Sequence, residues 1–239
     1  MSDEEDTDDW LGVDQAAGII RAYERALRFK PREAQMHFDY GIAFLELGIG
    51  FESQAIEAFK TAARLCPSWS AVHLQVGLAY ASANRREEAL DSYKRALALQ
   101  PDDTNALAAL AHTSLLLGCY KEAEEAATRI IEVAPLASVP HLILGVAHLL
   151  QSRYADADES LRRAISLESD LAEAHYGIGL AAIILGNDSV VQIQHERLRE
   201  LDCKLAEKLM EHREREAFTP AELLNCIFET DADVRTDKR

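Results

Sequence analysis

Proline recurs at a constant interval along this chain. Pro67, Pro101 and Pro135 are each 34 residues apart, and the next step of 34 reaches Ser169. Two rows of small residues keep the same period: Ala55, Ala89, Ala123 and Ala157, and Gly77, Ala111, Gly145 and Gly179. A fixed period of this length predicts a stacked-repeat solenoid rather than a single closed core. Such an array presents a surface, so its default function is to hold another molecule.

One period predicts a pair of antiparallel helices. Helix A is expected at about 70–83 and helix B at about 87–99, with a polar turn between them. Pro101 ends helix B because proline cannot continue the helical hydrogen-bond ladder. Gly77 is expected to let the two helices approach closely, with Ala89 opposite it. In the first unit Pro31 and Pro67 are 36 apart, which predicts two inserted residues near position 50.

These residues resemble the tetratricopeptide repeat, whose 34-residue pattern is W-x2-L-G-x2-Y, then A-x3-F, then P. The resemblance covers about Ala34 to Cys203, although no unit has the leading Trp, the fourth has Ser169 in place of the closing Pro, and the fifth lacks that Pro. It implies an all-α fold, a right-handed α-solenoid of helix-turn-helix repeats.

The pattern divides the chain into an acidic, disordered start, a repeat array, a capping helix and a tail. In the capping helix an apolar stripe is expected from Leu205, Ala206, Leu209 and Met210. The predicted segments are 1–13 (acidic start), 14–203 (array: half repeat 14–33, full repeats 34–69, 70–103, 104–137, 138–171 and 172–203), 204–216 (capping helix) and 217–239 (tail, with a short amphipathic helix near 220–228). Two interpretations stay open for Trp10 and Leu11: they fold back over the exposed side of Ile19 and Tyr23, or they are disordered, as is expected for the residues before Asp9.

Charge and composition exclude several classes of partner. The net charge is −16, which disfavours nucleic acid and anionic membranes, because both select for basic patches. No apolar stretch is long enough to span a bilayer, and the acidic start is unlike a secretory signal. The four cysteines form no C-x-x-C pair, which indicates reduced structural thiols. We therefore expect a cytoplasmic protein.

The sequence gives little sign of catalytic or metal chemistry. Four of the eight histidines, namely His37, His73, His141 and His175, occupy the same fourth position of helix A. One residue type in one repeated position indicates packing rather than a metal site. There is no Gly-rich phosphate loop and no G-x-S-x-G motif. We expect no catalytic residues, no metal and no cofactor.

The family resemblance implies where a partner binds. In tetratricopeptide arrays the A helices line a concave groove, and their second, fifth, ninth and twelfth positions point into it. The groove residues expected from the fifth and ninth positions are mostly apolar: Phe38, Ile42, Leu74, Leu78, His112, Leu142, Val146, Tyr176 and Leu180. The Lys, Asn and Arg clamp for chaperone C-terminal carboxylates is absent, so those tails are not expected to bind. Such a row favours an amphipathic helix or an extended apolar peptide; the other interpretation is burial in superhelical packing.

The tail contains a second candidate feature. Thr219-Pro220-Ala221-Glu222 is a helix start, with Thr as N-cap and Glu three residues later. An apolar stripe follows: Leu223, Leu224, Ile227 and Phe228. A helix this short is marginal alone. It needs the capping helix or the groove as a docking surface, or a second protomer in a homodimer.

The pattern as a whole predicts a non-catalytic protein-interaction scaffold. Its partner is a protein or peptide whose apolar or amphipathic segment enters the groove, and the acidic surface favours a basic flank on that partner. Two alternatives remain open: a cytosolic substrate chaperone that shields an apolar segment, and a self-associating structural subunit.

Overall fold

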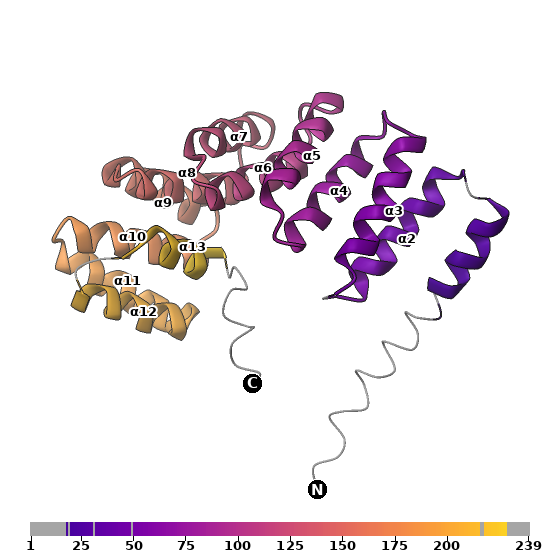
Figure 1. The fold of residues 1–239 in the computed structure, drawn as a ribbon. Coiled ribbons are helices and arrows are strands. Elements are labelled where there is room, and N and C mark those ends of the chain that lie inside the picture. The colour runs from indigo at the N-terminus through magenta and orange to yellow at the C-terminus, as the bar shows by residue number, and fades with distance from the viewer. Residues whose placement is uncertain (1–17, 19, 31, 49, 216–217, 229–239) are drawn as a thin grey trace, which may run out of the picture. The chain divides into compact units, whose positions relative to one another are not determined.

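The computed structural model describes residues 18–228 except 19, 31, 49, 216 and 217 (Figure 1). Every regular element among them is an α-helix. Residues 20–29 are helical, and the later helices are α2 (Ala34–Glu46), α3 (Glu52–Leu65), α4 (Ser70–Ser82), α5 (Arg86–Leu99), α6 (Thr104–Leu116), α7 (Tyr120–Val133), α8 (Val139–Leu150), α9 (Tyr154–Leu167), α10 (Ala172–Ile184), α11 (Asp188–Leu201), α12 (Cys203–Arg215) and α13 (Pro220–Phe228). The predicted all-α repeat fold is confirmed.

The chain divides within α6 into two compact units, residues 1–110 and 111–239. In unit 1, α2 packs on α3, α3 on α4, and α4 on α5. In unit 2 the same succession runs from α7 through α11, and α12 packs on both α10 and α11. Each helix therefore buries its apolar face against its neighbours along the chain. We call the first helix of each pair, namely α2, α4, α6, α8 and α10, an A helix.

The turns between paired helices repeat one backbone motif. Asn84, Gly118, Ser152 and Gly186 have φ of 58°, 75°, 59° and 67° and are spaced by 34 residues. After each of them, the next N–H donates to the carbonyl five residues earlier, at 2.8 Å in all four turns. This is the Schellman closure of a helix, which needs a left-handed residue at its end. Gly, Asn and Ser at these positions thus end each A helix and reverse the chain.

Close helix contact depends on a glycine in the A helix. A Cβ added at Gly77 would lie 2.4 Å from Cε1 of Tyr93, and one at Gly145 would lie 2.4 Å from Cγ of Leu161. The Tyr93 ring therefore fills the space beside Gly77. That Ala89 also lies opposite this glycine stays a prediction.

The first helix pair carries the two extra residues between its helices. Gly41 faces Phe59, 18 residues later, whereas Gly77 and Gly145 face residues 16 later. Helix α2 ends at Glu46 and α3 begins at Glu52. The insertion lengthens the turn and leaves the glycine-to-ring contact intact.

At the far end, α12 covers α10 and α11. Leu205, Ala206 and Leu209 of the expected stripe are buried, but Met210 is only partly buried. The prediction for Met210 needs correction: His212, one helical turn after Leu209, completes the buried stripe instead. The acidic segment 1–13, including Trp10 and Leu11, lies outside the described residues. In the described part of the chain, no helix is both long and apolar enough to cross a membrane.

Candidate functional site: the A-helix face

The predicted groove residues lie on the A helices. We call these predicted groove residues together the A-helix face. In unit 1 it consists of Phe38, Ile42, Leu74 and Leu78. In unit 2 it consists of His112, Leu142, Val146, Tyr176 and Leu180.

In unit 1 the A-helix face is partly open. Phe38 stacks on Trp69 with ring centroids 4.8 Å apart and meets the Phe59 ring edge-on at 5.6 Å. Ile42 is half-buried against a core cluster that includes Phe59 and Phe44. Leu78 is 37% exposed. Leu74, on the same helix, is buried, so unit 1 leaves Leu78 as the uncovered apolar side chain of the A-helix face on α4.

In unit 2 four of the five face residues are buried. Val146, Tyr176 and Leu180 have no exposed surface, and Leu142 is 5% exposed. His112 is half-buried. The ninth position thus changes from 37% exposure at Leu78 in unit 1 to none at Val146 and Leu180 in unit 2.

Helix α13 covers part of the A-helix face of unit 2, at Tyr176 of α10 and His112 of α6. It packs on α10, and Figure 1 shows the two helices side by side. The Phe228 ring at its last residue contacts the His112 ring of α6 edge-on, with centroids 4.7 Å apart. Leu223, Leu224 and Ile227 are all buried. The predicted tail stripe and the predicted groove residues thus meet in unit 2.

The buried Tyr176 phenol marks the centre of this contact. Burial, and then the neighbouring Cys226 thiol of α13, raise the pKa of Tyr176 far above its ordinary value. The phenol is therefore neutral, as a hydroxyl enclosed by a packed helix should be.

The start of α13 is fixed by a reciprocal capping box. The Thr219 backbone N–H donates to Glu222 Oε2 at 2.7 Å, and the Glu222 N–H donates to Thr219 Oγ1 at 3.2 Å. The hydrogen bond from the Thr219 backbone, helped by its side chain and by Arg215, lowers the pKa of Glu222 to about 2. The carboxylate stays ionised and stabilises the helix start.

The repeated histidines contact backbone carbonyls. Nε2 of His73 lies 2.8 Å from the Pro67 carbonyl oxygen, and Nε2 of His175 lies 3.1 Å from that of Ser169. Both carbonyls lie six residues before the histidine, at the closing turn of the preceding repeat. Nδ1 of His175 also contacts Gln194 Oε1 at 2.7 Å. These rings join one repeat to the next, which is a structural role.

Two tetratricopeptide repeat models match, one over residues 70–103 and one over residues 109–170 and 142–189. The chain is a tetratricopeptide repeat protein. The peroxisomal targeting signal receptor of Kluyveromyces lactis is 36% identical over 87 residues, which are 36% of this chain and 15% of the receptor. This protein thus spans well under a fifth of that relative's length.

Solved structures show the same fold. PilW, a type IV pilus biogenesis factor, superposes with a TM-score of 0.68 and 18% identity, over 86% of this chain and 99% of PilW. YrrB, described as a tetratricopeptide repeat protein with an unusual peptide-binding site, superposes with a TM-score of 0.64 and 16% identity, over 80% and 98% of the two chains. At these identities the likeness concerns the fold alone.

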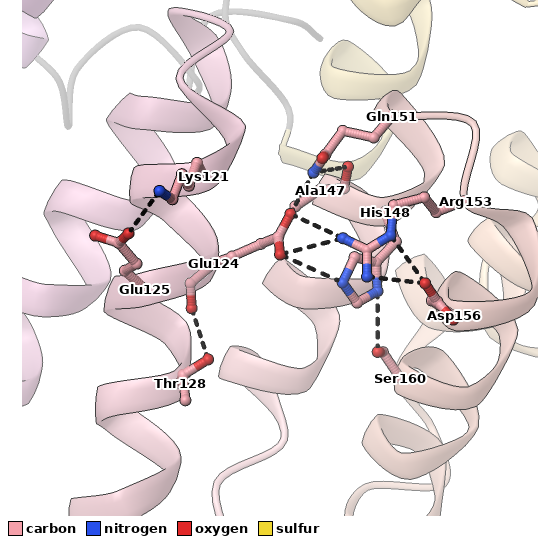
Figure 2. Close-up of polar contacts among 10 residues, drawn as sticks. All are labelled: Lys121, Glu124, Glu125, Thr128, Ala147, His148, Gln151, Arg153, Asp156 and Ser160. Atoms are coloured by element: carbon pink, nitrogen blue, oxygen red, sulfur yellow. Dashed lines mark hydrogen bonds and ion pairs between the residues drawn. The ribbon is translucent and has the colours of Figure 1, made fainter.

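A polar cluster joins the third and fourth tetratricopeptide repeats (Figure 2). Glu124 of α7 accepts hydrogen bonds from Gln151 and from Arg153, the latter at 3.3 Å to both oxygens. His148 Nε2 lies 3.7 Å from Glu124, and its Nδ1 lies 3.4 Å from Ser160 Oγ.

Ser160, His148 and Glu124 are linked in the sequence serine, histidine, carboxylate that a nucleophilic triad has, but their geometry does not fit one. The Ser160-to-His148 distance is long for activating a hydroxyl, and both oxygens of Glu124 are bound by Arg153. The arrangement can hold α7 against α8 and the turn to α9. We therefore assign it to joining the repeats. Among the described residues no group of three or more His, Cys, Asp or Glu side chains is arranged for a metal ion.

Sequence reasoning missed the residues that seat α13 on α12. Arg215 pairs with Glu222 at 3.0 Å, and the buried His212 ring lies 6.1 Å from the Phe218 ring. Arg215 Nη2 also donates to His212 Nδ1 at 3.0 Å, so Nδ1 is the unprotonated nitrogen. Arg215 and Glu222 are seven residues apart with a turn between them, and no sequence motif corresponds to that spacing. The sequence therefore gave no indication of this ion pair.

Proposed function

We propose that this protein is a non-catalytic interaction scaffold whose A-helix face binds an apolar or amphipathic segment of another protein. One observation carries the proposal: in unit 2 the A-helix face already accommodates an amphipathic helix, α13, with three buried aliphatic side chains. A surface that buries a helix from its own chain has the shape and polarity to bind one from a partner.

The surface of unit 1 supports the same function. Leu78 is 37% exposed and Ile42 is half-buried, and a partner that covers Leu78 gains free energy from apolar burial, at about 25 cal/mol for each Å². The net charge of −16 favours a partner with a basic flank, mainly through a faster association rate.

The test compares two leucines of similar exposure. Leu78→Glu places a charge on the A-helix face of α4, whereas Leu99→Glu, at a position 41% exposed at the end of α5, is the matched control. Partners are captured quantitatively from native lysate by wild type and by both variants, after circular dichroism has verified equal helicity. We expect a partner that Leu78→Glu loses and Leu99→Glu keeps. Equal capture by all three proteins would place binding elsewhere.

A further inference from the structure

Helix α13 is held on unit 2 at both of its ends. At its start, Glu222 forms an ion pair with Arg215 of α12 at 3.0 Å, and Phe218 contacts the His212 ring. At its end, Phe228 contacts the His112 ring of α6 at 4.7 Å. The helix therefore reaches from the last helix of the array, α12, to the A helix of the third repeat.

Between these ends, the apolar stripe of α13 is enclosed. Leu223 has no exposed surface, Leu224 is 7% exposed and Ile227 is 4% exposed. Cys226 lies beside the Tyr176 hydroxyl of α10. Outside this stripe α13 is solvent-exposed, at Ala221 on its flank and at Asn225. The stripe follows an i, i+1, i+4, i+5 pattern, which is one face of a helix.

This helix depends on its docking surface. It has 9 residues, and an isolated helix shorter than about 12–15 residues is marginal in water. Its capping box and its ion pair with Arg215 are both at the exposed start, where screening by solvent weakens them. Docked elements with few anchoring contacts open locally at much lower free energy than the whole fold.

We propose that the A-helix face of unit 2 is a binding site for a short amphipathic helix, that α13 is its resident occupant, and that a partner must displace α13 to bind. This inference rests on the proposed function and names its ligand. The partner helix carries Leu, Ile or Phe at i, i+1, i+4 and i+5. An acidic residue in its first turn faces Arg215, as Glu222 does.

Because α13 is tethered to the same chain, it competes with a partner helix and lowers the partner's apparent affinity for the A-helix face of unit 2. A tethered segment acts at an effective concentration on the order of 1 mM. For a free peptide that binds the empty face at about 10 µM, the tethered copy therefore weakens apparent affinity by about a hundredfold.

The test uses a fluorescein-labelled peptide with the sequence of residues 218–228 and full-length protein under reducing conditions. Fluorescence anisotropy gives its affinity for wild type, for Ile227→Glu and for Ala221→Glu. Ile227→Glu puts a charge on the buried side of α13, and Ala221→Glu puts the same charge on its exposed side. We expect Ile227→Glu to bind the peptide about tenfold or more tightly than the other two proteins. A peptide that itself carries the Ile227→Glu change should not bind.

Hydrogen exchange separates release of α13 from misfolding. In Ile227→Glu, amide protection should be lost at 220–228 and kept in α8, α10 and α12. Equal peptide affinity for wild type and Ile227→Glu overturns the inference, as does the absence of binding to either. A wild-type dimer that Ile227→Glu converts to a monomer also overturns it, because α13 would then be exchanged between two copies. The Leu78→Glu comparison in unit 1 tests the proposed function independently of all these outcomes.

Discussion

The packing of Gly77 against Tyr93 gives a quantitative test of how these repeats are held together. A methyl group at residue 77 would lie 2.4 and 2.5 Å from two carbons of the Tyr93 ring, which is 1% exposed and has no free space to move into. Overpacking of this kind costs about 1–3 kcal/mol, and the fixed ring favours the upper limit. Replacing glycine by alanine within a helix returns about 1 kcal/mol. We expect Gly77→Ala to lower the free energy of unfolding by about 2 kcal/mol.

The third repeat shows how the same contact can be made with other residues. Its equivalent positions hold Ala111 and Ala127, both fully buried, where the second repeat has Gly77 and Tyr93. A larger residue in the A helix is thus matched by a smaller one in its partner helix. Tyr93→Ala alone should cost about 4 kcal/mol, as large-to-small changes of buried aromatic residues do.

The double variant measures the coupling between the two positions. Once the ring is removed, the methyl group of Gly77→Ala enters empty space and partly fills it. The double variant should therefore cost about 4 kcal/mol rather than the additive 6, a coupling energy of about 2 kcal/mol. Urea unfolding followed by circular dichroism gives all four free energies. Additivity within about 0.5 kcal/mol would refute the argument, because it would mean that the two side chains do not compete for one space.

Three further outcomes follow from the polar contacts. The pKa of Glu222 falls from 4.5 to about 2 on folding, so the stability that its carboxylate gives to α13 is complete above about pH 4.5 and is lost as pH falls through 2. An NMR titration that gives this carboxyl a pKa of 4.5 would contradict the expectation. Glu124→Gln, which removes the charge that Arg153 binds, should cost about 1–2 kcal/mol, whereas Glu125→Gln, at a carboxylate 69% exposed, should change stability by less than about 0.5 kcal/mol in the same urea assay. His175→Ala should cost about 2 kcal/mol in thermal unfolding, since it leaves the buried Gln194 without its 2.7 Å partner, and an unchanged midpoint would show that the ring contributes nothing.

Local chemistry explains why so much of the fold was predictable. Pro101 and its equivalents end their helices, and Gly118, Gly186 and Asn84 are residue types that adopt the left-handed conformation readily. Ser152 takes the same conformation without that preference. The Thr219-to-Glu222 spacing likewise predicted the start of a helix that begins at Pro220. Each of these signals acts within a few residues, so no knowledge of the remaining chain was needed.

The candidate site was less accessible to sequence reasoning because its key contacts join distant residues. The period placed Val146 and Leu180 in the same row as Leu78, yet the first two are fully buried and the third is 37% exposed. The difference coincides with α13, whose stripe of Leu223, Leu224 and Ile227 is compatible with any apolar surface of the right width. Hydrophobic burial has no directional code, so the stripe alone does not specify where the helix docks.

The sequence by itself thus determined the repeat, the ends of its helices and the tail helix, because these depend on backbone conformation and on periodic burial. Only the tertiary structure decided which ring fills the space beside Gly77, and that α13 lies on α10 with Phe228 against His112. Those choices depend on side-chain shape and on contacts between residues up to 116 positions apart along the chain. The local sequence of an apolar segment does not show which distant apolar surface it will pack against.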